Sequence, residues 1–164
     1  MTKTLYITRH GKSSWDFDNI TDIDRPLNSR GVNNAYLMAE KLKSKGQIPD
    51  LLLSSPAIRA LHTANIFLRT LGMDWDSLKI NEKIYFGYTN DILEVIRQLD
   101  NRYASVMVFG HNPAFTELAN NFLKTPVDNI PTAGIVTLVF PVDKWTEIRN
   151  ASPDSEEFNY PKKQ

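Results

Sequence analysis

The chain has 164 residues, the length of one domain with a sizeable hydrophobic core. Its 19 lysines and arginines balance its 19 aspartates and glutamates, so we expect neither nucleic acid nor a membrane surface as a partner. The chain has no cysteine, which excludes disulfides, thiolate catalysis and cysteine-ligated zinc. The first residues lack the apolar core of a signal peptide and no apolar run could span a membrane, so we expect a soluble, cytoplasmic protein.

Short apolar runs alternate with amphipathic segments of helical length. Runs that predict strands occur at residues 4–8, 50–54, 78–81, 105–110, 134–140 and 145–148. Helices are expected between them, at residues 32–45, 55–71, 91–100 and from 112 onward, with an irregular stretch at 82–90. This alternation is typical of an α/β fold with a mostly parallel sheet covered by helices.

Two of the helices carry clear start signals. Ser55 is a natural N-cap with Pro56 at the first helical position, and Asn112 with Pro113 repeats the pattern. We expect residues 1–149 to form a single domain. The polar, proline-punctuated segment 150–164 is predicted to be a loose C-terminal extension.

Four chemically active residues follow the ends of three predicted strands. Arg9 and His10 directly follow the first strand, and Arg59 lies one turn into the helix after the second. His111 follows the strand that ends at residue 110. Because the carboxyl ends of parallel strands meet at one edge of a sheet, where ligand sites of such folds form, we expect the four to lie together.

The chemistry of these residues predicts a phosphate site. Two guanidinium groups match the geometry of an oxyanion, and helix N-termini at the same edge add backbone donors. A neutral histidine can attack phosphorus, and a second histidine, if cationic, would stabilise the transferring oxygens. No metal or cofactor is required by this scheme. Taken singly, each residue also has an ordinary interpretation, as a solvated strand end, a turn residue or half of a surface ion pair.

Three neighbouring features are less specific. Gly11 either lets the backbone approach a phosphate or is a plain turn glycine. Asp24 and Arg25 are expected to form a local ion pair that orders the loop over the site. His62 lies in the middle of a predicted helix and is interpreted as structural or superficial.

Five segments, in order, resemble the histidine phosphatase superfamily, and most closely its small SixA-type phosphohistidine phosphatase branch. They are "RHGKSSWD", "DIDRPLNSRG", "PDLLLSSPAIRALHTA", "FGHNPAFTELAN" and "NIPTAGIVTLVF", which together cover the chain from about residue 4 to 149. The resemblance implies a phosphoglycerate mutase-like, three-layer α/β/α sandwich.

The resemblance also implies roles for individual residues. His10 would be the nucleophile that becomes phosphorylated, Arg9 and Arg59 would bind the phosphoryl group, and His111 would complete the pocket. Gly11 would belong to the substrate-binding motif. Glu82 stands where larger members carry a general acid, and its alternative interpretation is a surface glutamate.

These observations predict a metal-independent phosphatase with a phosphohistidine enzyme intermediate. The favoured substrate is phosphohistidine on another protein, because the short connections build no lid over the site. Asp16 stands where the mutases of the superfamily have asparagine, which argues against mutase activity. A general small-molecule phosphomonoesterase is the alternative enzyme, and a phosphate- or phosphoprotein-binding module is the alternative without catalysis.

Overall fold

A six-stranded sheet forms the centre of the protein in the computed structural model, which describes residues 1–162. The strand order is β3-β2-β4-β1-β5-β6. The strands are β1 (Lys3–Arg9), β2 (Leu51–Ser54), β3 (Leu78–Ile80), β4 (Ser105–Gly110), β5 (Ile135–Phe140) and β6 (Ser155–Asn159). The helices are α1 (Ser29–Ser44), α2 (Ile58–Thr70), α3 (Lys83–Phe86), α4 (Thr89–Arg97) and α5 (Ala114–Asn120), with short 3-10 turns η1 (Asp22–Asp24), η2 (Trp75–Ser77) and η3 (Trp145–Asn150).

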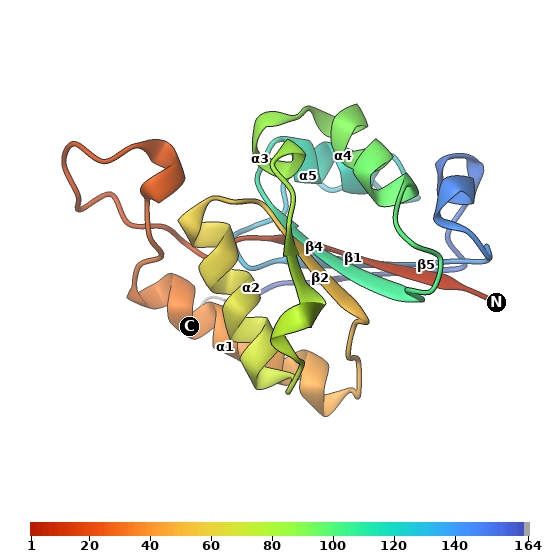
Figure 1. Cartoon of the computed structure of the whole chain (residues 1–164), viewed down its shortest axis with the longest axis horizontal. Coiled ribbons are helices and arrows are strands. Elements are labelled where there is room, and N and C mark those ends of the chain that lie inside the picture. The colour runs from red at the N-terminus through yellow and green to blue at the C-terminus, as the bar shows by residue number, and fades with distance from the viewer. Residues whose placement is uncertain (163–164) are drawn as a thin grey trace.

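Helices cover both faces of this sheet, so the predicted three-layer α/β/α architecture is confirmed. Helices α1 and α2 pack on one face, and α3, α4 and α5 on the other (Figure 1). Strands β1, β2, β3 and β4 run parallel, whereas β5 pairs antiparallel with β1. The central strands are buried on both faces, which explains why they read as continuous apolar runs rather than alternating ones.

The segment expected as a strand at 145–148 is instead the 3-10 turn η3, and the strand prediction is wrong there. Glu147 accepts a hydrogen bond from the backbone of Lys144, which closes the turn. The turn places the fully buried Trp145 in the core under α4, where its indole N–H donates to the Tyr103 carbonyl at 2.9 Å. A short apolar run does not distinguish a strand from a buried turn.

The polar tail also differs from the expectation. Residues 155–159, predicted to belong to a loose extension, form β6, which pairs antiparallel with β5 and extends the sheet. Lys45 binds Glu157 at 2.8 Å and ties this edge to α1. An edge strand needs little apolar content, so its composition resembled that of an unstructured tail.

Several helix boundaries also shift by two or three residues, among them the start of α5, which is at Ala114 with Pro113 rather than Asn112 at the N-cap. Helix α2 begins at Ile58 rather than at Ser55, whose hydroxyl accepts the backbone N–H of Ala57 instead of capping the helix proper. The stretch 82–90 contains the single-turn helix α3 and the start of α4. Within residues 1–162, no helix has both the length and the apolar character needed to cross a membrane.

Replacing Trp145 by alanine should lower the free energy of unfolding by about 3–5 kcal/mol, because it removes a buried aromatic ring and leaves a cavity. Urea denaturation followed by circular dichroism would measure the change. Trp75, which is 63% exposed, provides the matched control, and its alanine variant should stay within about 0.5 kcal/mol of the parent. Equal effects of the two substitutions would show that η3 does not anchor the core.

Candidate active site

The pairing of β1 with β4 brings two histidines side by side. Arg9 pairs with Gly110 at the last position of the parallel ladder, so both strands end at the same level. The residues that follow, His10 and His111, then have ring centroids 5.1 Å apart. Arg59 lies in the first turn of α2, the helix that follows the neighbouring strand β2.

The four residues predicted from the sequence to lie together do so. They line one cavity of about 310 Å³ at the carboxyl edge of the sheet. The cavity is lined by Arg9, His10, Lys12, Ser13, Trp15, Arg25, Arg59, His111, Asn112 and Thr132. The lining holds four lysines and arginines and no carboxylate, so the cavity is suited to an anion.

Gly11 holds the turn after β1 against two helices. A Cβ built on Gly11 would lie 2.7 Å from the Gly31 carbonyl oxygen of α1, and one built on Gly31 would lie 2.1 Å from the Lys12 carbonyl oxygen. The Gly11 N–H donates to Thr63 Oγ1 at 3.0 Å, and the Thr63 hydroxyl donates to the Arg59 carbonyl at 2.7 Å. The absence of a side chain at Gly11 therefore serves close packing against α1, and Gly11 is not among the cavity-lining residues.

His10 is held in the tautomer that a nucleophile needs. Its Nδ1 lies 2.6 Å from the Gly11 carbonyl oxygen, which can only accept a hydrogen bond, so Nδ1 carries the proton. The lone pair is therefore on Nε2. Burial, assisted by the charges of Arg59 and Arg9, lowers the pKa of His10 to about 4, so the ring is neutral near pH 7.

His111 is also neutral in the substrate-free protein. Its Nε2 lies 2.7 Å from Ser55 Oγ, and its Nδ1 is buried without a hydrogen-bond partner among residues 1–162. Burial first, and then the proximity of His10 and Arg59, lower its pKa to about 3. The charge-stabilising role that the sequence suggested for a cationic His111 would need a bound anion, whose negative charge raises the pKa of the ring.

Three arginines at the cavity leave buried donors unused. Within the described chain, the Nε atoms of Arg9, Arg25 and Arg59 are buried and have no hydrogen-bond partner. The other nitrogens are partly engaged: Arg9 Nη1 donates to the Ile130 carbonyl at 3.0 Å. Because native proteins seldom leave buried polar groups unpaired, this concentration of orphaned donors indicates a ligand with several acceptor oxygens.

Asp22, which was not predicted from the sequence as a site residue, connects several of these groups. Arg59 donates to the Asp22 carbonyl at 2.6 Å and to its carboxylate Oδ2 at 2.9 Å. Tyr85 of α3 donates to the same Oδ2 at 2.6 Å, and its ring packs 5.4 Å from the His111 ring, centroid to centroid. Nothing local in the sequence links Asp22 to Tyr85, because the contact depends on how α3 folds over the sheet edge.

Arg25 pairs differently from the prediction. Its guanidinium lies 3.2 Å from Asp22 Oδ1 and stacks 3.8 Å from the centroid of the Trp15 ring. Asp24 instead accepts the Thr21 hydroxyl at 2.7 Å, so the expected ion pair between Asp24 and Arg25 is not formed. Arg25 is thus a third arginine that lines the cavity. Its position in the polar loop after β1 was the sequence signal that could have identified it as a site residue.

Glu82, the predicted general acid, lies just before α3. Its side chain is exposed, and it is not among the residues that line the cavity. Asp16 is exposed as well, and its backbone N–H donates to Ser14 Oγ. The general-acid role of Glu82 stays a prediction.

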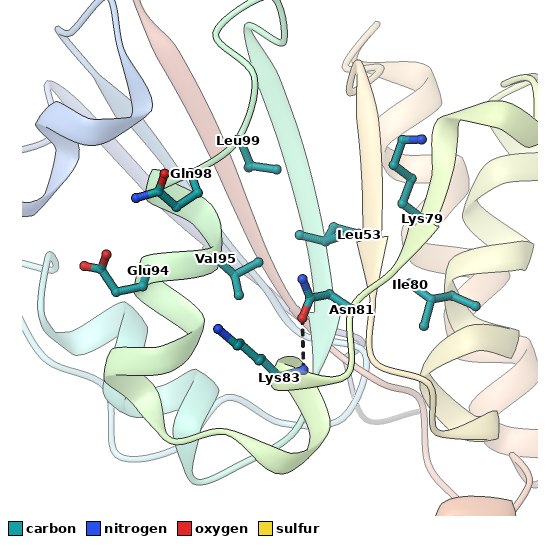
Figure 2. A pocket seen from close by; sticks show the side chains of 9 residues that line it. All are labelled: Leu53, Lys79, Ile80, Asn81, Lys83, Glu94, Val95, Gln98 and Leu99. Atoms are coloured by element: carbon teal, nitrogen blue, oxygen red, sulfur yellow. Dashed lines mark hydrogen bonds between the residues drawn. The ribbon is translucent and has the colours of Figure 1, made fainter.

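A different cavity, of about 410 Å³, lies between α4 and the strands β2 and β3. Figure 2 shows its apolar wall of Leu53, Val95 and Leu99, with the side chain of Asn81 accepting the backbone N–H of Lys83. The residues that line it include no histidine and no arginine. Of these two cavities, the one at the carboxyl edge therefore combines histidines with arginines.

The fold and the cavity define an α/β protein with a cationic cavity beside a neutral histidine. Residues 5–87 match the family model of the histidine phosphatase superfamily (branch 1). The chain belongs to this superfamily, as its sequence motifs indicated.

Individual relatives divide between two activities. A 2,3-bisphosphoglycerate-dependent phosphoglycerate mutase from Clavibacter michiganensis is 36% identical over 89 residues, covering 51% of this chain and 36% of the mutase. The chain thus matches only about a third of that protein. A crystal structure of a candidate phosphohistidine phosphatase SixA from Agrobacterium tumefaciens superposes with a TM-score of 0.79 at 25% identity, covering 98% of this chain and 99% of that one. The protein histidine phosphatase SixA complexed with tungstate gives a TM-score of 0.77 at 25% identity, covering 93% and 95% of the two chains. The structural likeness to the SixA proteins, over nearly the whole of each chain, supports a phosphatase of that branch.

The histidine pKa values can be checked by following the ring nitrogens by NMR as the pH is lowered. We expect His10 and His111 to stay neutral at pH 5, because their pKa values are lowered to about 4 and about 3, and His10 to show the Nδ1–H tautomer. The exposed His62 is the internal control and should titrate at the highest pH of the three. Protonation of His10 at pH 6 would contradict the proposed electrostatics.

The same shifts couple protonation to folding. In the unfolded chain a histidine has a pKa of about 6.5, so between that pH and about 4 the unfolded state binds more protons than the folded state. The free energy of unfolding should therefore fall as the pH is lowered from 7 to 4. A His10→Asn variant should show a shallower decline.

Proposed function

We propose that this chain is a phosphatase that removes phosphate from phosphohistidine on another protein, by way of a phosphohistidine enzyme. The observation that carries the proposal is His10, held neutral and with Nε2 unprotonated beside a cluster of arginines. Binding of phosphate alone would require the arginines but not a nucleophile oriented in this way.

In the first step, Nε2 of His10 forms a bond to phosphorus as the bond between phosphorus and the leaving group breaks. The electron pair of the broken bond goes to the leaving group. Arg9, Arg25 and Arg59 hold the three phosphoryl oxygens, and His111 borders the same cavity. In the second step the oxygen of water forms a bond to phosphorus as the P–N bond breaks, and the electron pair of that bond returns to Nε2 of His10. The proton that the water loses leaves with inorganic phosphate or passes to solvent.

We propose that these steps need no metal ion. The arginines supply the positive charge that many phosphoryl-transfer enzymes take from divalent cations. In residues 1–162, no group of three histidine, aspartate or glutamate side chains lies close enough to hold a metal ion. The proposal therefore predicts a rate that chelators do not change.

A protein-borne substrate is supported by the surroundings of the cavity. A larger cavity of about 520 Å³ adjoins it through the shared residue Thr132 and includes Arg30, Tyr160 and Lys162. Trp15, 77% exposed, stands at the rim. The adjoining cavity and Trp15 offer contact area to residues that flank a phosphorylated side chain on another protein. Exposed aromatic groups commonly mark such interfaces.

Phosphohistidine is favoured over phosphate esters because the cavity lining contains no carboxylic acid. An ester oxygen departs as an alkoxide unless an acid protonates it, whereas a phosphorylated imidazole can be protonated on its other ring nitrogen by solvent. The match to phosphoglycerate mutases keeps a small phosphate ester as the second candidate substrate.

Trapping the intermediate tests the mechanism. After brief incubation with a labelled phosphodonor and an alkaline quench, we expect acid-labile, alkali-stable phosphate on His10. His10→Ala should lose this label and at least about 10³-fold in turnover, because the nucleophile is removed. His62→Ala, a substitution on the exposed side of α2, is the matched control and should keep both; full turnover by His10→Ala would refute the mechanism.

Comparing two substrates separates the two enzyme activities. The parent protein should dephosphorylate a phosphohistidine protein with a higher kcat/KM than para-nitrophenyl phosphate, and EDTA should change neither rate. Glu82→Gln should change kcat/KM for the phosphohistidine protein by less than about twofold, since Glu82 is exposed and outside the cavity. Strong ester hydrolysis that Glu82→Gln abolishes would instead support a phosphomonoesterase with Glu82 as its acid.

A further inference from the structure

Asp22 binds two of the arginines that line the cavity and is itself exposed to solvent. Its side chain is 53% exposed, although it binds Arg59, whose side chain is only 6% exposed. It also binds Arg25, and both arginines line the cavity. The carboxylate is thus accessible from outside and lies within hydrogen-bond distance of two arginines of the cavity.

The hydrogen bonds of this carboxylate leave one acceptor position open. An ionised carboxylate offers about four lone-pair positions. Oδ2 accepts from Arg59 at 2.9 Å and from Tyr85 at 2.6 Å, while Oδ1 accepts only from Arg25, at 3.2 Å. Within the described chain, Oδ1 therefore has room for one further donor on the exposed side.

The titratable groups that face Asp22 keep it ionised. Arg25 comes from its own loop, Arg59 from α2, Tyr85 from α3 and the more distant His111 from the loop after β4. The hydrogen bond from Tyr85, followed by those from Arg59 and Arg25, lowers the pKa of Asp22 well below its usual range. Asp22 is thus an acceptor at neutral pH and not a general acid.

We propose that Asp22 determines specificity for nitrogen-linked over oxygen-linked phosphate, by accepting a hydrogen bond from the protonated imidazole ring of the substrate. This inference rests on the proposed function. It goes further in assigning to one side chain the recognition of the leaving group, whereas the other charged groups of the cavity recognise the phosphoryl group.

The chemistry of the leaving group explains the preference. The imidazole ring of phosphohistidine is a better leaving group when its second nitrogen carries a proton. The electron pair of the breaking P–N bond then returns to a cationic ring, and neutral imidazole is released. The proton stays on the second nitrogen and continues to be donated to Oδ1. A phosphate ester instead develops negative charge on its leaving oxygen, which a neighbouring carboxylate repels.

The charge balance of the cavity also favours a carboxylate that accepts a hydrogen bond from the protonated ring of the substrate. Arg9, Lys12, Arg25 and Arg59 together exceed by two the charge of a dianionic phosphoryl group. That excess would oppose protonation of the substrate ring, and the carboxylate of Asp22 offsets part of it. An opposite charge within about 4–6 Å shifts the pKa of an ionisable group by about one unit or more.

Asp22→Asn tests the proposal, since it keeps the shape and the backbone contact to Arg59 but removes the charge. We expect the ratio of kcat/KM for a phosphohistidine protein to that for para-nitrophenyl phosphate to fall at least about tenfold, the worth of one charge-assisted hydrogen bond. In single-turnover phosphoryl transfer from the phosphohistidine protein, the alkaline limb of the pH profile should move about one unit lower.

Asp24→Asn is the matched control. Asp24 belongs to the same 3-10 turn and accepts only the Thr21 hydroxyl, so both the ratio and the pH profile should match the parent. Inhibition by inorganic phosphate measures whether a substitution weakens phosphate binding by the arginines. Such weakening would lower kcat/KM in parallel for the phosphohistidine protein and for para-nitrophenyl phosphate.

The outcomes distinguish this inference from the proposed function. A parent protein that does not dephosphorylate phosphohistidine would refute the proposed function. A parent protein that does so, combined with an Asp22→Asn variant whose ratio and alkaline limb are unchanged, would overturn the role of Asp22 alone.

Discussion

The parallel pairing of β1 with β4 is the constraint on which the site depends. Arg9 and Gly110 form the last residue pair of this ladder, so β1 and β4 end at the same level. The histidines that follow the two strands therefore become neighbours. A register shift of one residue would turn each side chain to the opposite face of the sheet. The buried apolar residues on both faces of β1 and β4 oppose such a shift, so the packing of the core fixes the distance between the two reactive rings.

The electrostatics of the cavity follow from its burial. Two histidines and three arginines converge at one cavity, and burial keeps each histidine neutral. The arginines stay charged because their guanidinium groups give up protons only at very high pH. The same environment thus places uncharged histidines beside charged guanidinium groups.

The main elements of the fold and the four principal site residues could be predicted from the sequence, because they depend on local signals. Apolar runs mark the buried strands, and chemically active residues directly after such runs mark the sheet edge. The predictions failed where the decisive contact is distant. Trp145 is buried by its position under α4, and β6 is defined by its pairing with β5 rather than by its own composition. Asp22 and Tyr85 meet only in the folded protein, and neither carries a local signal of that contact.

The Thr63 hydroxyl has a mechanical consequence for the site. It accepts the N–H of Gly11 and donates to the carbonyl of Arg59, so one side chain joins the turn that carries His10 to the helix that carries Arg59. The two segments that bring His10 and Arg59 to the same cavity are therefore held together by a single hydroxyl group, and losing it would loosen both at once.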